Sequence, residues 1–439
     1  MADPPISAPT YVSPELDVSI VMPCLNEAVT LRQCIDMARA ALASMEERWS
    51  VTGEVVVADN GSTDGSQDLA ENLGARVVEC PVRGYGAALR YGIYAARGRL
   101  IVMGDADASY DFREAVPMVE RLLEGDEVCM GSRLKGAILP NAMPWKNRYI
   151  GNPVLTGILN LFFRSGFSDA HCGLRAFTKE AFVRIRPTSN GMEFASELVI
   201  KASLLGLRRS EVPVTLRPDG RPGPPHLRPF RDGWRHLRYL VMLSPVWLFL
   251  FPGVGLASIA AAIMAALLPM HPGTVFRLGS FWIGDHWMIL ASGFLSIGQL
   301  SLLLALTATL VGIRDGYRRP TRLLRGLYWL SRLEHMMMLS GIFLVFGVGV
   351  MIEVLLAWAT TGFGPLAMQR YMVLATTLFV LAAQTFLGGF LLSIVAGNEA
   401  DIAISVENAR RRQPRSRRPG SSARGNSPGT APGAGRPSA

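Results

Sequence analysis

Cysteine and histidine are scarce in this 439-residue sequence, which has five of the first and six of the second. No two cysteines form a C-x-x-C pair; they stand at Cys24, Cys34, Cys80, Cys129 and Cys172. Structural zinc sites use closely spaced Cys and His ligands, and small secreted domains rely on cysteines that form disulfides. The sequence supports neither arrangement, and it fits a protein whose thiols stay reduced.

Two common phosphate-binding motifs are missing as well. Gly84-Tyr85-Gly86 begins like a dinucleotide fingerprint, but Leu89 stands where the third glycine belongs. No Walker-type loop occurs anywhere in the chain. Their absence argues against a dehydrogenase and against an ATPase.

Charged residues are absent from long stretches of the second half. None occurs at 239–276, 287–313 or 371–398, and a fourth apolar run at 336–361 contains only Glu353. A helix of about 20 apolar residues crosses a bilayer. We therefore predict a membrane domain at 241–398 with four transmembrane helices, at about 241–268, 287–313, 337–359 and 371–396. Buried core helices are the alternative, but such helices are rarely this long and uncharged. An ionisable residue inside a span is expected to be functional or paired, and Glu353 could pair with Gln384.

The flanks of these runs predict the topology. Residues 1–17 form an N-terminal tail without a signal-peptide pattern, so we expect the domain that follows to stay in the cytoplasm. Residues 226–240 mix arginines and aromatic residues, which predicts a juxtamembrane amphipathic helix. Six arginines at 314–332 lie between the second and third spans. By the positive-inside rule we expect the domain before the spans and the C-terminus to face the cytoplasm, as in a multi-pass protein of the plasma membrane.

The last residues, 399–439, are rich in Pro, Gly and Ser, and 408–439 contains eight arginines and no acid. Such a segment cannot bury a core, so we predict a disordered basic cytoplasmic tail. A contact with anionic lipid is one role for it. Nucleic-acid binding is not expected.

Residues 18–225 alternate apolar runs with helical segments, which is typical of an α/β domain with a mostly parallel sheet. In such sheets ligands bind beyond the carboxyl ends of the strands. Asp105 and Asp107 follow one apolar run, and alternate residues of an extended segment point to the same side. Two carboxylates there form an oxygen site suited to Mg²⁺ or Mn²⁺, which bridges diphosphate oxygens.

Two other turns carry polar residues that could meet a nucleotide. The segment Pro23-Cys24-Leu25-Asn26-Glu27 follows the first apolar run, and 58–65, from Ala58 to Gly65, follows the second. Asp59 could accept hydrogen bonds from a base edge. Capping of the following helices by Asn26, Ser62 or Asp64 is the structural alternative.

These motifs, in this order, resemble glycosyltransferase family 2, with its GT-A nucleotide-binding fold. Three later segments resemble the dolichol- and polyprenyl-phosphate sugar transferases of that family: Met130-Gly131-Ser132-Arg133, Asn147-Arg148-Tyr149-Ile150-Gly151-Asn152 and Asp169-Ala170-His171-Cys172-Gly173-Leu174-Arg175. The resemblance covers about residues 18–245. It implies a metal-dependent, inverting transfer of a monosaccharide from a nucleotide-sugar, such as UDP-glucose or GDP-mannose, to polyprenyl or dolichyl phosphate.

The resemblance also assigns residues. The nucleotide-sugar site would comprise Pro23, Asn26, Glu27, Asp59, Asn60, Ser62, Asp64 and Asp105. The metal would bind at Asp105, Asp107 and Ser109. The catalytic residues would be Asp107 and Asp169, the latter as a base or as the residue that holds Arg175. The acceptor phosphate would contact Arg133, Arg148 and Arg175. Many relatives have Gln at the position of Ser109, so Ser109 could act through water, or Asp111 could compensate.

Several alternatives stay open. Glu193 and Glu197 could orient the sugar or the arginines, or could simply begin a helix, and His171 is expected to pack rather than to bind a metal. A polysaccharide synthase is disfavoured because its Gln-x-x-Arg-Trp motif is absent. A lipid flippase or transporter is disfavoured because the spans hold a single charged residue. The resemblance names no sugar and leaves a homo-oligomer open.

Overall fold

The computed structural model describes residues 11–220, 229–270, 274–279, 281–318, 332–364 and 368–396. The predicted basic tail at 399–439 lies outside these ranges, and so do residues 1–10 of the predicted N-terminal tail. Residues 226–228 of the predicted juxtamembrane helix and 319–331 of the arginine-rich loop also lie outside them.

A seven-stranded sheet organises the first part of the described chain, in the order β3-β2-β1-β4-β6-β5-β7. Neighbouring strands are parallel except at β6, which is antiparallel to β4 and β5. The strands are β1 Leu16–Cys24, β2 Gly53–Asp59, β3 Arg76–Glu79, β4 Gly98–Met103, β5 Val128–Ile138, β6 Arg175–Thr178 and β7 Arg209–Leu216. The register places Cys24 beside Asp59 and Val21 beside Met103, so the carboxyl ends of β1, β2 and β4 share one edge.

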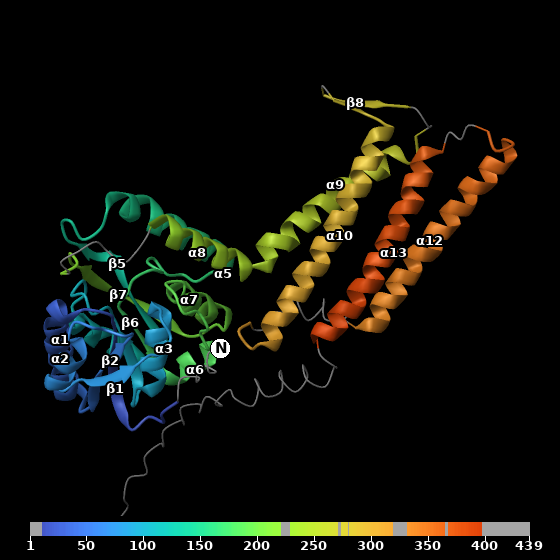
Figure 1. Cartoon of the computed structure of the whole chain (residues 1–439). Helices are drawn as coiled ribbons and strands as arrows, with labels where there is room; N and C mark the ends of the chain where they lie inside the picture. The colour runs from blue at the N-terminus through green and yellow to red at the C-terminus, as the bar shows by residue number, and fades with distance from the viewer. Residues whose placement is uncertain are drawn as a thin grey trace, which may run out of the picture. The chain divides into compact units, whose positions relative to one another are not determined.

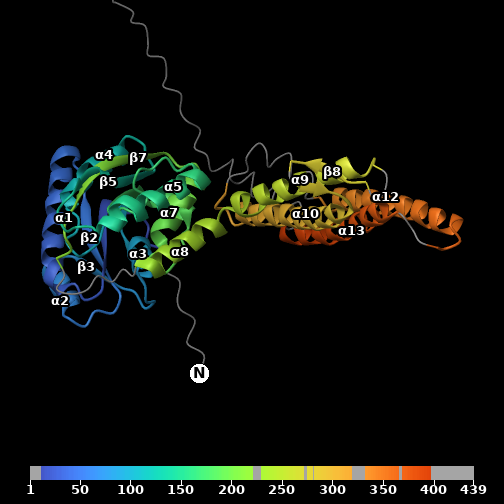
Figure 2. The ribbon, with the colours of Figure 1, turned by 90° about the horizontal axis from the view of Figure 1, so that it is seen from above.

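Helices cover both faces of the sheet, as Figure 2 shows for α1 on one side and α3 and α7 on the other. Successive strand residues enter different cores: Ile20 and Met22 pack with α1 and α4, whereas Val21 packs with α3 and α7. The elements are α1 Ala28–Trp49, α2 Ser66–Asn72, α3 Tyr85–Ala95, η1 Phe112–Ala115, α4 Val116–Leu123, η2 Asn147–Gly151, α5 Asn152–Phe163, α6 Lys179–Ile185 and α7 Phe194–Leu204. This alternation explains why the strands read as continuous apolar runs.

Within the described residues, four long apolar helices follow, at Val246–Leu267, Asp285–Arg314, Leu333–Thr360 and Gln369–Val395. Their most apolar windows have mean hydropathies of 2.0–2.4, and at most 33% of any window is buried, so most side chains face outward. The elements of this part are α8 Pro229–Met242, η3 Val246–Leu250, α9 Phe251–Leu267, β8 Phe276–Leu278, β9 Phe281–Ile283, α10 Asp285–Arg314, α12 Leu333–Thr360 and α13 Gln369–Ala396 (Figure 1). The first span begins after Pro245, later than residue 241, because Ser244 and Pro245 separate α8 from η3.

Polar contacts link these helices. Arg370, 2% exposed, donates to Asp285 at 2.5 Å and to the carbonyls of Leu267, Met270 and Thr274. One guanidinium therefore joins the ends of α9, α10 and α13. The pairing expected for Glu353 is not formed: this side chain is exposed, and the buried Oε1 of Gln384 has no hydrogen-bond partner among the described residues.

Candidate active site

The turn after β2 is organised around the carboxylate of Asp59, which is 1% exposed. Its oxygens accept hydrogen bonds from the backbone of Gly61 at 2.9 Å and of Ser62 at 3.1 Å, and from Gln67 Nε2 at 2.6 Å. Burial alone raises the pKa of Asp59, but these hydrogen bonds outweigh it and lower the pKa below its ordinary value. Asp59 is therefore a fixed anion at the edge of the sheet.

The turns after β1 and β2 hold each other in place. Asn26, at a left-handed φ of 59°, accepts from the Thr63 backbone at 2.8 Å and donates its own N–H to Ser62 Oγ at 2.9 Å. Asp64 accepts from the Ala28 backbone at 2.9 Å. The candidate residues of this turn pair, which also include Pro23 at the end of β1 and buried Glu27, thus lie together. Asn60 differs, because its amide serves the loop before α3: it donates to Val82 O at 2.7 Å and accepts from Gly84 N at 2.7 Å.

Asp105 and Asp107 lie just beyond β4, on a tight turn. Ala108 takes a left-handed φ of 60°, which a residue with a Cβ rarely adopts. Four hydrogen bonds hold this conformation: Thr30 Oγ1 to Ala106 O at 2.7 Å, Ser109 N to Asp107 Oδ1 at 3.0 Å, Gly220 N to Asp107 O at 3.0 Å and Arg217 N to Ser109 O at 2.9 Å. Strained backbone of this kind is concentrated at functional sites.

The Asp111 carboxylate is held by two arginines. It is 4% exposed and pairs with Arg113 at 2.6 Å and Arg217 at 2.9 Å, and it caps η1 through the Arg113 backbone. These partners hold its pKa below the ordinary value even though burial alone would raise it. Both arginines already neutralise Asp111 in the structure, and the choice between Ser109 acting through water and compensation by Asp111 stays a prediction.

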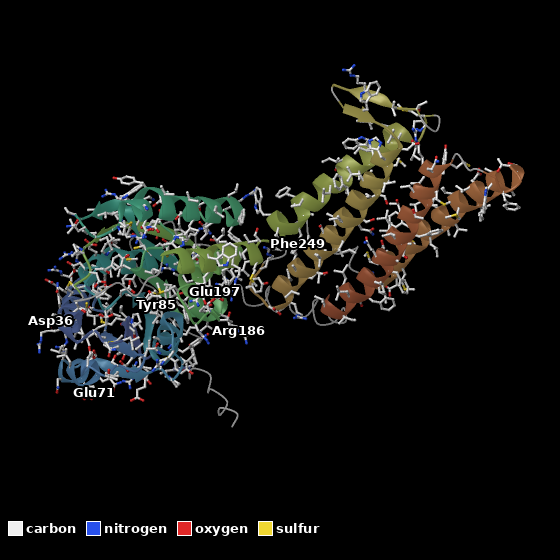
Figure 3. The ribbon with its side chains drawn as sticks, turned by 45° about the horizontal axis from the view of Figure 1, so that its top comes forward. Asp36, Glu71, Tyr85, Arg186, Glu197 and Phe249 are labelled. Atoms are coloured by element: carbon white, nitrogen blue, oxygen red, sulfur yellow. The ribbon has the colours of Figure 1, made fainter. Side chains whose placement is uncertain are left out.

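Two residues near Asp105 were not singled out from the sequence. The hydroxyl of Tyr85, labelled in Figure 3, donates to Asp105 Oδ1 at 2.9 Å. Its burial and the neighbouring Asp105 charge raise the pKa of Tyr85 well above the ordinary value, so it stays a donor. Gly173 is the other: a Cβ at this position would lie 2.5 Å from Asp105 Oδ2. The glycine in Asp169–Arg175 was the available signal, because glycine marks close backbone approach.

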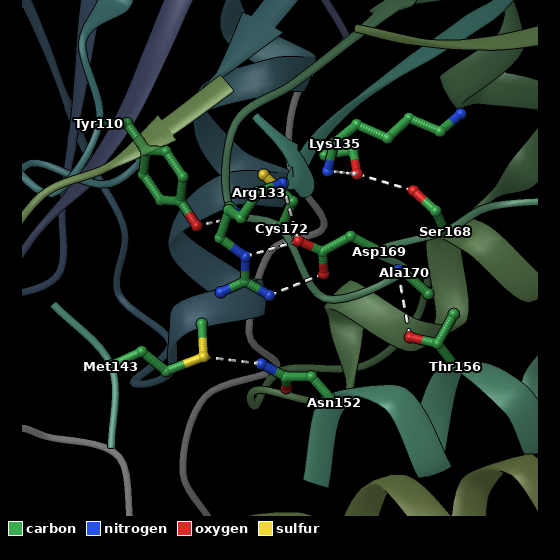
Figure 4. Close-up of polar contacts among 12 residues, drawn as sticks. Tyr110, Arg133, Lys135, Met143, Asn152, Thr156, Ser168, Asp169, Ala170 and Cys172 are labelled. Carbon is green, nitrogen blue, oxygen red and sulfur yellow. Dashed lines mark hydrogen bonds and ion pairs between the residues drawn. The ribbon is translucent and has the colours of Figure 1, made fainter. Parts of the chain in front are cut away.

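Arg133 and Asp169 form a buried, bidentate ion pair (Figure 4). Arg133 Nε donates to Asp169 Oδ2 at 2.6 Å and Nη2 to Oδ1 at 2.7 Å, with side-chain exposures of 9% and 0%. Burial raises the pKa of Asp169, but Arg133 lowers it below the ordinary value. The third nitrogen, Nη1, points away from Asp169 in Figure 4 and has no hydrogen-bond partner among the described residues. The expected pairing of Asp169 with Arg175 is wrong, because Asp169 holds Arg133 instead.

Arg175 is 1% exposed and bonds to backbone carbonyls rather than to a carboxylate. It donates to Cys172 O at 2.8 Å, Ala195 O at 2.6 Å and Ala170 O at 3.2 Å. Burial lowers the pKa of its guanidinium. Arg175 therefore joins the segment 169–175 to α7, and it offers almost no surface to a lipid phosphate.

Arg148 differs from both, because it lies half-buried on the π-helical turn η2 and stacks over the Tyr149 ring at 5.4 Å. No hydrogen bond or ion pair of Arg148 occurs among the described residues. Around it, large apolar side chains are 52–67% exposed: Trp145, Tyr149, Ile150, Val154 and Leu161. We call these five residues the apolar face of η2–α5.

Glu197 and His171 have mainly structural contacts. Glu197, 0% exposed, pairs with Lys201 at 2.5 Å and accepts from Thr188 and Ser189, so it fixes the loop before α7. Glu193 Oε1 accepts from Gly191 N at 3.3 Å, and its buried Oε2 has no partner among the described residues. His171 packs edge-on against His236 of α8 at 5.2 Å, as expected, and burial lowers its pKa to about 3.

Comparisons with known proteins point to one family. Residues 19–186 match the family model described as Glycosyl transferase family 2, and residues 306–396 match the C-terminal transmembrane region of that family. A low-salt glycan biosynthesis hexosyltransferase, Agl6 of Haloferax volcanii, is 37% identical over 88% of this chain and 90% of its own.

Other relatives match the first half. A dolichyl-phosphate hexose transferase of Haloferax volcanii is 30% identical over 49% of this chain and 89% of its own length. A dolichyl-phosphate beta-glucosyltransferase of Trichomonas vaginalis is 30% identical over 48% and 66%. A glucosyl-3-phosphoglycerate synthase of Mycobacterium tuberculosis, crystallised with Mn²⁺ and UDP, aligns over 52% of this chain and 78% of its own, with a TM-score of 0.40 and 22% identity.

The predicted fold class, a GT-A domain with a mostly parallel sheet followed by four apolar helices, is confirmed. The prediction of a glycosyltransferase with a membrane region is confirmed with it. The chain belongs to glycosyltransferase family 2.

Proposed function

We propose that this enzyme transfers a monosaccharide from a nucleotide-sugar to polyprenyl or dolichyl phosphate, with inversion at the sugar carbon and with a divalent metal ion. The product would be a lipid-linked sugar for glycan or cell-envelope assembly. One observation carries the proposal: a carboxylate turn and an arginine with a free nitrogen occur in one domain that continues into membrane-crossing helices. The relatives named for dolichyl-phosphate transfer support it.

The residues of the turn fit Mg²⁺ or Mn²⁺. Asp105 and Asp107 supply hard oxygen ligands, and the described residues contain no group of three or more His, Cys, Asp or Glu that could enclose a metal. Mg²⁺ commonly binds through one or two carboxylates together with substrate phosphates and water, so the sparse ligand set suits it. When bound, the ion would neutralise charge on the departing diphosphate.

The donor would lie along the edge formed by β1, β2 and β4. Asp59, held as an anion, would accept hydrogen bonds from the base. The joined turns at Asn26 and Asp64 would fix the walls of the nucleotide site. Tyr85 would keep Asp105 oriented, because its hydroxyl donates to one of the carboxylate oxygens.

The acceptor needs no strong general base. A phosphate monoester already carries a nucleophilic oxygen at neutral pH, because its second pKa is about 6. The free Nη1 of Arg133 and the guanidinium of Arg148 would hold this phosphate, and bidentate or paired donors suit it well. Asp169, with both oxygens on Arg133 and a lowered pKa, would position Arg133 rather than remove a proton.

The apolar face of η2–α5 supports a lipid acceptor. Large exposed apolar patches mark interaction surfaces, and here arginine and aromatic residues lie together as they do at a bilayer interface. Phe162 of α5 stacks on Trp247 in the first span, with ring centroids 5.3 Å apart. Arg148 would then meet a phosphate at headgroup level. We place the catalytic domain and the C-terminus in the cytoplasm, since the arginines gather between the second and third spans.

A transfer assay with the purified full-length enzyme tests the proposal. The donors would be UDP-glucose and GDP-mannose with a radiolabelled sugar, and the acceptors polyprenyl phosphate, polyprenol and no lipid. We expect label in the organic phase with polyprenyl phosphate alone, and its loss in excess chelator. Transfer to polyprenol would contradict the phosphate acceptor, and full activity in chelator would contradict the metal. Reporters after Ala439 and near Gly273 test the orientation, because they should read on opposite sides.

A further inference from the structure

A small pocket lies where α8 ends and α10 leaves its apolar stretch. Its volume is about 230 Å³, roughly the space of seven to eight liquid water molecules. The apolar walls come from two segments, with Leu243 and Pro245 on one and Ala308 and Val311 on the other. The polar residues Tyr317 and Arg318 complete the lining. One side of the pocket is thus continuous with a membrane span, and the other presents a guanidinium and a phenol.

The pocket is held by specific contacts. Arg318 donates from its backbone to Gly312 O at 3.0 Å and from Nη2 to Leu243 O at 3.1 Å, so it joins α8 to α10. A Cβ on Gly312 would lie 3.0 Å from the Tyr317 ring, so glycine gives the ring its place. The same ring receives Lys201 Nζ of α7 at 5.6 Å, and Lys201 pairs with buried Glu197.

Arg318 has no carboxylate partner among the described residues. The nearest acid in sequence, Asp315, pairs with Arg314 at 3.2 Å. Burial lowers the pKa of the Arg318 guanidinium, and the neighbouring Tyr317 phenol only partly counteracts this effect. A partly buried cation without an anion is costly, and a bound anion would remove most of that cost.

The position of the pocket indicates which anion is available. Val311 is three residues before Arg314, where the apolar sequence of α10 gives way to charged residues. Lipid phosphates lie at this boundary, and basic residues next to a span attract anionic lipid. A free phosphate would match the guanidinium but would leave the walls formed by Ala308 and Val311 uncovered. A lipid satisfies both parts.

We propose that this pocket binds one anionic membrane phospholipid, with its phosphate on Arg318 and Tyr317 and its first chain carbons against Ala308 and Val311. The bound lipid would fix the junction of α8 with α10. Through Tyr317 and Lys201 it would stabilise the loop that Glu197 organises. None of the wall residues belongs to the proposed sugar-transfer site, so the inference does not depend on the proposed reaction.

Lipid binding by the full-length protein tests this inference without an activity assay. Protein in a neutral detergent would be titrated with phosphatidylglycerol or phosphatidylcholine, and retained lipid would be counted by native mass spectrometry. We expect phosphatidylglycerol to bind at one site, and Arg318→Gln to weaken it at least about tenfold, the ratio for loss of one charge-assisted hydrogen bond. The matched control is Arg314→Gln, because Arg314 is 48% exposed and pairs with Asp315; its affinity should equal that of the parent.

A second variant keeps the test decisive should Arg318→Gln fold poorly. Ala308→Leu retains the charge and fills the apolar wall, so it should also weaken phosphatidylglycerol binding. Inorganic phosphate and polyprenyl phosphate form two further arms. If Arg318→Gln and Ala308→Leu both retained as much phosphatidylglycerol as the parent protein, the proposed site would be wrong. Two results would overturn the assignment to a membrane phospholipid. One is binding of inorganic phosphate without binding of phosphatidylglycerol, and the other is retention of polyprenyl phosphate in preference to phosphatidylglycerol.

Discussion

The carboxylates and the arginines of the candidate site are held in different ways. Asp59 ends β2, Asp105 and Asp107 follow β4, and the two strands end at one edge of the sheet. Backbone N–H groups or hydroxyls bind all three carboxylates. The three arginines have three separate environments: Arg133 in an ion pair, Arg175 among carbonyls and Arg148 on a half-buried helical turn. The carboxylate side is therefore built by backbone position, and the arginine side by tertiary partners.

This difference has an energetic basis. A carboxylate at a turn finds backbone N–H groups within a few residues, as Asp59 does at Gly61 and Ser62. A guanidinium has up to five donors and must find acceptors elsewhere in the fold. Arg133 and Arg175 are both buried, yet one uses a carboxylate and the other three carbonyls. We therefore expect substitutions on the two sides to fail differently, with lost chemistry on one and lost stability on the other.

The largest effect should follow from Asp107→Asn. This change keeps the side-chain shape and the Ser109 hydrogen bond but removes the charge that a divalent ion needs. We expect transfer to fall by about 10³ or more, since a metal contributes several kcal/mol of charge stabilisation. The thermal midpoint should stay close to that of the parent. Asp36→Asn, an exposed substitution on α1, is the control. Retained activity in Asp107→Asn would show that transfer does not require Asp107 as a metal ligand.

Breaking the buried ion pair should instead cost stability. Removing one partner of such a pair typically costs about 3–5 kcal/mol, because the other charge stays buried. For a domain of this size, Arg133→Gln should lower the thermal midpoint by roughly 6–20 °C. Arg99→Gln, which breaks an exposed pair with Asp17, is the control and should change little. An unchanged midpoint in Arg133→Gln would mean that the pair is not held in solution.

The same pair predicts a dependence on pH. The pKa of Asp169 is lower in the folded protein than in the unfolded chain, where it is about 3.9. Its stabilising contribution is therefore complete above that value and is lost as the pH falls through the lower, folded pKa. The thermal midpoint of the parent should therefore fall below about pH 4. Asp169→Asn should have a lower midpoint than the parent at pH 7, and its midpoint should depend less on pH in the acid range. If the thermal midpoints of both proteins fell in parallel as the pH was lowered, ionised Asp169 would not be the source of this stability.

The sequence was sufficient for the strands of the first part of the sheet and for the carboxylate edge, but it did not locate β5, β6 or β7. Continuous apolar runs located β1, β2 and β4, and their carboxyl ends carried Asn26, Asp59 and Asp105. Both depend on local pattern and on the general geometry of parallel sheets. The ion-pair partner of Asp169 could not be predicted from the sequence. Arg133 and Arg175 stand in different segments, and only the fold decides which of them reaches Asp169. Tyr85 was missed for the same reason, since its target lies 20 residues away.

Arg148→Lys tests whether any arginine on this side is free for the acceptor. Lysine keeps the charge but loses the planar fork that binds phosphate, so kcat/KM for the lipid should fall about 10–100-fold, the equivalent of one charge-assisted hydrogen bond. The thermal midpoint should not change, because Arg148 makes no hydrogen bond or ion pair among the described residues. Lys135→Arg, a conservative change at an exposed position of β5, is the control. Unchanged lipid kinetics would exclude Arg148 from the acceptor site.

The smallest predicted effect concerns the backbone of the carboxylate turn. Ala108 holds a φ of 60°, where a Cβ costs about 1–2 kcal/mol and glycine costs nothing. Glycine also loses about 0.4–1 kcal/mol through the freer unfolded chain, so Ala108→Gly should gain roughly 0.5–1 kcal/mol. Hydrogen bonds from other residues fix the turn independently of residue 108, and their donors are Thr30, Ser109, Gly220 and Arg217. Transfer should therefore stay within about twofold of the parent, because the Asp107 carboxylate keeps its place.

Thermal unfolding and donor kinetics on one preparation measure both quantities. Ala87→Gly, at a helical position inside α3, is the opposite control and should lose about 1 kcal/mol. Equal destabilisation in both variants would show that the turn is not strained, and a large loss of transfer in Ala108→Gly alone would show that the Cβ itself holds Asp107 in position.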